Sequence, residues 1–161
     1  MNAQLVFYIG KKLAHFVKEF EAYSPEVGEF DAENDSRGVV IESPVFPDDP
    51  AKHIYIDFGE EFVLYWNGWH MSYSPEDFWY DLLVAQLHKI LSGDALSAVV
   101  TDEKGKVVMS TVIEAKTNPS SAIDIFVHSS TPDFVKKDLS EKAAVCTVTA
   151  WPGKSHTLPI K

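Results

Sequence analysis

The sequence predicts an α+β fold, in which an antiparallel, meander-like sheet of about six to eight strands is packed by an N-terminal helix and a central helix. Three observations lead to this class. Apolar residues recur with helical spacing near the N-terminus, an Asn-Gly pair joins two stretches of alternating polarity in the middle, and short β-branched runs separated by turn residues follow. The chain of 161 residues is expected to form one domain spanning residues 1–161.

The first segment, residues 3–23, predicts one amphipathic helix. Its apolar positions share a face: Leu5, Ile9, Leu13, Phe16, Val17 and Phe20. Gly10 weakens this helix by about 1 kcal/mol relative to alanine, so a strand at residues 5–9 followed by a shorter helix remains an alternative. The Ser24-Pro25 pair is expected to end the helix, because the residue before a proline is disfavoured in helical conformation.

An acidic connection follows at residues 26–37. It carries five carboxylates: Glu26, Glu29, Asp31, Glu33 and Asp35. Such a run predicts a solvated loop, and a second interpretation is a charged lip that meets a basic partner. Residues 38–42 then predict a short strand, which the Ser43-Pro44 pair ends.

A hairpin is predicted at Asn67-Gly68, because a type I′ turn needs positive φ at both central residues and this pair supplies it at least cost. A two-residue loop places Trp66 opposite Trp69. Side chains alternate between the two faces of a strand, so one face is wholly apolar or aromatic. That face holds Phe62, Leu64, Trp66, Trp69, Met71 and Tyr73, and the other holds Glu61, Val63, Tyr65, His70 and Ser72.

The preceding strand extends the same sorting. A three-residue loop at residues 59–61 places Phe58 opposite Phe62 and adds Ile54 and Ile56 to the apolar face. The polar face then gains three residues: His53, Tyr55 and Asp57.

The central helix is predicted to follow at once. Ser74 is the expected N-cap, Pro75 the first helical residue and Asp77 the partner in a capping box. Gly93 suits the position just after the helix. An apolar stripe of helical spacing is expected to cover the apolar face of the sheet: Trp79, Leu82, Leu83, Leu87, Ile90 and Leu91.

The C-terminal third is predicted to be β throughout, apart from one turn of helix after the Thr-Pro-Asp sequence at residues 131–133 and ending by Lys137. The expected strands are residues 96–101, 107–114, 123–128 and 144–151, with a turn at 103–105 and a loop at 118–121.

Composition narrows the function. The chain has 24 acidic and 14 basic residues and a formal net charge of −10, which argues against nucleic acid and anionic membrane as ligands and favours a basic protein partner. No apolar run is long enough to cross a bilayer. With one cysteine, Cys146, no intramolecular disulfide can form, and a cytoplasmic location is expected.

One cluster could carry chemistry. His53, Asp57, Tyr65 and His70 are predicted on the same sheet face, and two histidines with a carboxylate can bind a metal or transfer protons. Cross-strand histidines and tyrosines on an exposed face are more often surface or interface residues. There is no phosphate-binding glycine loop and no Gly-x-Ser-x-Gly motif. We therefore predict no catalytic, cofactor or metal site, and a small enzyme or metal protein remains the alternative.

Residues 58–79, FGEEFVLYWNGWHMSYSPEDFW, resemble a recurring bacterial pattern. The pattern is E-F-x-L-x-W, a short turn, W-H, and an acidic helix start. It is similar to small bacterial proteins of the toxin-immunity type. In those sequences a second histidine often stands two places after the first, where this chain has Ser72.

The resemblance implies a protein that works by binding, occluding a toxin domain that is often a basic nuclease. The candidate partner-binding residues are Glu29, Asp31, Glu33, Asp35, Glu60, Glu61, Tyr65 and His70. A structural subunit of a larger assembly is a further alternative, and the oligomeric state is not predicted.

Overall fold

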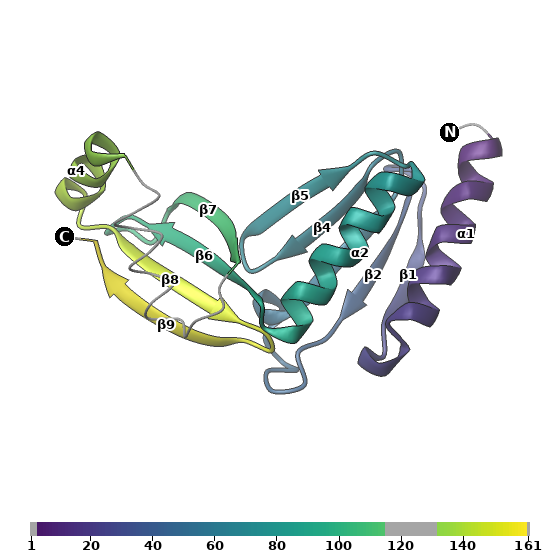
Figure 1. Cartoon of the computed structure of the whole chain (residues 1–161), viewed down its shortest axis with the longest axis horizontal. Helices are drawn as coiled ribbons and strands as arrows, with labels where there is room; N and C mark the ends of the chain where they lie inside the picture. Colours follow the sequence, from purple (N-terminus) through teal and green to yellow (C-terminus); the bar gives the residue numbers. More distant parts are fainter. Residues whose placement is uncertain (1–2, 115–131, 161) are drawn as a thin grey trace. The chain divides into compact units, whose positions relative to one another are not determined.

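The computed structural model describes residues 3–114 and 132–160 of the chain. The predicted α+β class is confirmed, and the antiparallel strands divide between a five-stranded sheet and a four-stranded sheet (Figure 1). The chain separates into two compact units. The first comprises residues 1–66 and 70–88, and the second comprises residues 67–69 and 89–161.

The five-stranded sheet of the first unit is a meander in which each strand pairs with the next along the chain. Its strands are β1 (Glu26–Asp31), β2 (Ser36–Ile41), β3 (Ile54–Phe58), β4 (Phe62–Trp66) and β5 (Trp69–Tyr73). The acidic segment predicted as a loop is therefore the β1–β2 hairpin. The loop prediction was wrong. The charged side chains suggested a solvated segment, but an antiparallel strand can keep such side chains exposed while it pairs with its neighbour, as β1 does with β2.

The register predicted for the middle of the sheet is confirmed. Phe58 pairs with Phe62 and Ile54 pairs with Trp66. Asn67 and Gly68 have φ values of 48° and 79°, as the predicted type I′ turn requires. Met71 is 43% exposed on β5, an edge strand, so the predicted apolar face is not buried along its whole width.

Both long helices of this unit contribute to the core above the apolar sheet face. α1 (Ala3–Glu19) buries Ile9, Leu13 and Phe16, so the alternative of a strand at residues 5–9 is wrong. The ring of Phe16 lies against that of Phe58 of β3, with 5.3 Å between centroids. A short 3-10 helix, Glu21–Tyr23, then leads into β1.

α2 (Asp77–Ser92) starts two residues later than predicted. The amide of Tyr80 donates to the carbonyl of Glu76, so the helix begins after Glu76, and Ser74 is not its cap. The buried stripe is also rotated from the prediction, because Leu82 is 41% exposed and Trp79 is half-buried. The residues that are buried are Tyr80, Leu83, Leu87, Ile90 and Leu91. Gly93, with φ of 82°, follows the helix as predicted.

The four-stranded sheet of the second unit has the order β7-β6-β8-β9. Its strands are β6 (Ala95–Thr101), β7 (Val107–Glu114), β8 (Val145–Ala150) and β9 (Lys154–Pro159). The first three were predicted, whereas β9 was not. The predicted loop at 118–121 and strand at 123–128 lie outside the described residues.

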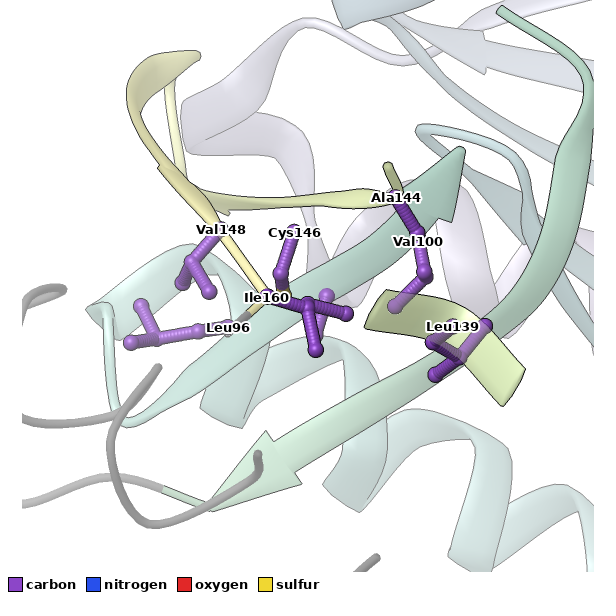
Figure 2. Close-up of a cluster of buried hydrophobic side chains, with 8 residues drawn as sticks. Leu96, Val100, Leu139, Ala144, Cys146, Val148 and Ile160 are labelled. Atoms are coloured by element: carbon purple, nitrogen blue, oxygen red, sulfur yellow. The ribbon is translucent and has the colours of Figure 1, made fainter. Parts of the chain in front are cut away.

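The second unit has its own core. α4 (Asp133–Glu141) is longer than the predicted single turn of helix and contributes Leu139 to that core. Figure 2 shows Leu139 with side chains from β6 and β8, among them Val100 and Cys146, and with Ile160 from the end of the chain.

Candidate functional site

The face of the five-stranded sheet that carries the polar residues is hollowed. A cavity of about 620 Å³ opens on it, which we call the acidic hollow. Its lining comes from β1 to β4 and their turns: Gly28, Glu29, Asp31, Asn34, Ser36, Gly38, Val40, Asp57, Gly59, Glu60, Glu61, Val63 and Tyr65. The carboxylates in this lining have no lysine, arginine or histidine beside them in it, so the hollow presents negative charge.

Glycine creates the space beside the half-buried carboxylate of Asp57. Gly38 pairs with Asp57 across β2 and β3, and a Cβ at Gly38 would lie 3.4 Å from the Asp57 carboxylate. At Gly59, a Cβ would lie 3.0 Å from the Cβ of Ser36, closer than ordinary packing allows. Both glycines line the hollow, and a side chain at Gly38 would crowd the Asp57 carboxylate, so Gly38 keeps Asp57 accessible.

Asp57 is the least solvated carboxylate of the hollow. Burial raises the pKa of its carboxyl group above the ordinary value of 3.8, and the negative charge of Asp31 raises it further. The pKa of the neighbouring Tyr65 hydroxyl is raised by burial and by the charge of Asp57. No hydrogen bond to the Asp57 side chain is found within residues 3–114 or 132–160, so its carboxylate is available to a cation entering the hollow.

The pKa of Asp31 is shifted in the opposite direction from that of Asp57. Its carboxylate accepts hydrogen bonds from the side-chain amide of Asn34 at 2.8 Å and from the backbone amides of Glu33 and Asn34 at 2.9 and 3.2 Å. The side-chain bond from Asn34 lowers the pKa of Asp31 most, and the backbone bonds lower it further. Asp31 therefore stays charged to lower pH than Asp57 while shaping the β1–β2 turn.

The predicted partner-binding residues divide between the hollow and its surroundings. Those that line it are Glu29, Asp31, Glu60, Glu61 and Tyr65. Glu33 is exposed in the β1–β2 turn, and Asp35 lines a different cavity on the helix side of the sheet. His70 is exposed on β5, with its ring centroid 5.8 Å from that of Tyr65.

The alternative site predicted from His53, Asp57, Tyr65 and His70 is only partly assembled in the structure. Asp57 and Tyr65 share the hollow, whereas neither His53 nor His70 lines it. The His53 ring lies near that of Tyr55, with 6.2 Å between centroids, but His53 is only 6% exposed, so it is not the exposed residue that was predicted. Its Nε2 atom has no hydrogen-bond partner in the described part of the chain. Among the residues described, no group of three or more His, Cys, Asp or Glu side chains is placed to hold a metal ion.

Sequence reasoning missed a polar cluster between α1 and α2. Lys12 pairs with Asp77 at 2.8 Å and lies 4.4 Å from the ring centroid of Tyr80. His15 Nδ1 lies 2.8 Å from the Tyr80 hydroxyl, and the Tyr8 hydroxyl donates to Asp77 at 3.2 Å. The spacing of Tyr8, Lys12 and His15 on one helical stripe was the available signal. These contacts join two helices, so we interpret the cluster as structural.

Comparison with known proteins identified no relative of this chain. A scan against protein-family models, a search of curated proteins and a search of solved structures each found no match to this chain. None of the helices in residues 3–114 and 132–160 combines the length and apolar character needed to span a membrane.

Proposed function

We propose that this chain is an acidic protein-binding module, acting as an immunity protein that neutralises a basic toxin domain in the cytoplasm by occluding it. The observation that supports this proposal is the acidic hollow, whose carboxylates converge on one concave surface with no cation in the lining. The E-F-x-L-x-W…W-H resemblance supplies the class of partner, and β4 of that motif lies in the wall of the hollow.

The electrostatics of the hollow favour a cationic partner. Complementary potentials speed encounter and select partners, and this chain carries a net charge of −10. Asp31 keeps its charge because the Asn34 amide and two backbone amides stabilise it. Asp57 has lost part of its hydration without gaining a hydrogen bond, so a lysine or arginine of the partner would supply the missing donor.

Binding alone is enough for this function. An inhibitor that inserts its acidic surface where a basic toxin binds its own substrate needs no catalytic group. The hollow's carboxylates and the Tyr65 hydroxyl provide acceptors for several guanidinium or ammonium groups at once.

The test is co-expression of this chain with the toxin domains encoded next to its gene, scored by cell survival and by co-purification. The informative variant is Glu60→Gln with Glu61→Gln, which removes two charges from the hollow. The matched control is Glu21→Gln with Glu103→Gln, which changes the net charge equally at exposed positions outside the hollow.

We expect the hollow variant to lose protection and to bind the toxin about tenfold more weakly, and the control to protect like the parent chain. Survival with the hollow variant equal to that with the parent would contradict the proposal. So would the absence of protection against every neighbouring toxin.

A further inference from the structure

The β1 strand forms an open edge of the five-stranded sheet. It stands first in the strand order, and all six of its residues are exposed. Figure 1 shows β1 at the margin of the sheet, next to α1. In the described part of the chain, no strand pairs with its outer side. An open edge presents unpaired backbone groups that another chain can meet.

A second cavity lies behind this edge, on the helix side of the sheet. It measures about 240 Å³ and is mostly apolar, and we call it the apolar pocket. Its lining is Val6, Ile9, Gly10, Leu13, Phe30, Asp35, Arg37 and Phe58. Phe30 of β1 and Val6 of α1 are 50% and 54% exposed, so the pocket is open to solvent beside the edge.

The acidic hollow and the apolar pocket lie on opposite faces of the same strands. Glu29 and Asp31 line the hollow, whereas Phe30 between them lines the pocket. In β3, Asp57 and Phe58 divide in the same way. A strand added beside β1 would continue this alternation, because successive side chains of a strand point to opposite faces.

We propose that the edge of β1 receives an extended segment of the partner as an additional strand, and that this segment alternates lysine or arginine with large apolar residues. The basic side chains extend over the acidic hollow, and the apolar side chains extend toward the apolar pocket. Main-chain hydrogen bonds supply affinity in this mode, and the two cavities supply specificity. The proposal rests on the proposed function, because it names the partner segment that the acidic surface binds.

Charge at the edge selects against a second copy of this chain. Pairing β1 with a second β1 would gather Glu26, Glu29 and Asp31 of both copies along one seam, and like charges on neighbouring strands are destabilising. A basic segment would instead be attracted by these carboxylates. The register with β2 shifts between Val27 and Phe30, an irregularity that interrupts continuous pairing, so the added strand is short.

The probe is a short synthetic peptide in which lysine alternates with valine and phenylalanine, titrated into the ¹⁵N-labelled full chain. A peptide of the same composition with its lysines grouped is the control for alternation. Two further versions carry N-methyl groups on alternate residues, one set for each edge of the peptide. The readouts are amide shifts and amide hydrogen exchange of residues 26–31.

We expect the alternating peptide to bind about tenfold more tightly than the grouped one and to slow exchange at alternate amides of β1. One N-methylated version loses binding, because its blocked amides face β1, and the other binds like the parent. Gly10→Leu should abolish the preference for alternation by filling the pocket. A Cβ at Gly10 meets nothing within 4 Å, so the first carbon of the new side chain causes no clash.

Strand addition is overturned if the grouped peptide and both N-methylated peptides bind as well as the alternating one. In that result the proposed function stands as long as the Glu60→Gln, Glu61→Gln variant still weakens toxin binding. Protection of the β1 amides by self-association of the chain without peptide also overturns it, because a second copy then occupies the edge. If the peptide pairs with β1 but the Glu60→Gln, Glu61→Gln variant binds the toxin as well as the parent chain does, the proposed function is overturned instead.

Discussion

The Asp57 carboxylate is half-buried without a hydrogen-bond partner among the described residues, and this arrangement has a cost in stability. Burial raises its folded-state pKa above 3.8, so the folded protein binds the proton more readily than the unfolded chain does. The charged form therefore destabilises the folded state at neutral pH. A position that lowers stability while shaping a cavity is typical of a binding site.

Asp57→Asn should consequently stabilise the protein at neutral pH by about 0.5 kcal/mol, within the range of surface substitutions. The gain is complete above the folded-state pKa of Asp57 and disappears as the pH falls below 3.8, where both states are protonated. Urea unfolding at the two pH values measures it. A loss of stability at neutral pH, or a gain independent of pH, would show that desolvation is not the cause.

Glycine-to-alanine substitution is expected to change the free energy of unfolding in opposite directions at two positions. Gly68 has φ of 79° in the type I′ turn, so Gly68→Ala should destabilise the protein by about 1–2 kcal/mol. Gly10 lies inside α1 with open space at its Cβ, so Gly10→Ala should stabilise by about 0.5–1 kcal/mol. Thermal unfolding distinguishes the two variants, and a shared sign would contradict the turn geometry or the helix.

At the scale of the element, the two adjacent leucines of α2 report which side of the helix is buried. Leu83 is fully buried and Leu82 is 41% exposed. Leu83→Ala should cost about 2–5 kcal/mol, as buried leucine truncations do. Leu82→Ala should change stability by about 0.5 kcal/mol or less. Equal losses from the two variants, measured by denaturant unfolding, would favour the broader stripe expected from the sequence.

Elements governed by local rules were predictable from the sequence. The Asn67-Gly68 turn fixes the hairpin, and the alternation of side chains then fixes the register back to Ile54. The prediction for α2 identified Leu83, Leu87, Ile90 and Leu91 but omitted Tyr80, which enters the core through tertiary contacts. Its hydroxyl lies 2.8 Å from His15 and donates to the carbonyl of Lys12. A count of aliphatic residues cannot register such a contact between helices.

The candidate site was predictable only in part. Tyr65 belongs to β4, whose register was predicted, and Glu61 directly precedes this strand, so their common side of the sheet was predicted correctly. The contribution of Glu29 and Asp31 depends on the β1–β2 hairpin, which the acidic sequence concealed. The glycines that line the hollow also gave no signal in the sequence, because the space they leave exists only when β2 and β3 are paired.

At the scale of the whole molecule, each of the two units has an apolar core of its own. Leu83 belongs to the core of the first unit, and Leu96 lies with Cys146 in the core of the second. Cys146 is the only cysteine of the chain, and burial raises the pKa of its thiol to about 11. Iodoacetamide therefore reacts with it only when the second unit opens, because the reactive species is the exposed thiolate.

This thiol can test whether the chain unfolds as the single domain that its length predicts. We expect Leu96→Ala to accelerate Cys146 alkylation at least tenfold, because truncating a buried leucine costs about 2–5 kcal/mol and each 1.4 kcal/mol is tenfold in the open population. Leu83→Ala should leave the rate unchanged, because its lost contacts belong to the core of the first unit. Mass spectrometry of the alkylated chain measures both rates under native conditions. Equal acceleration by the two variants would show that the cores open together, as one cooperative domain.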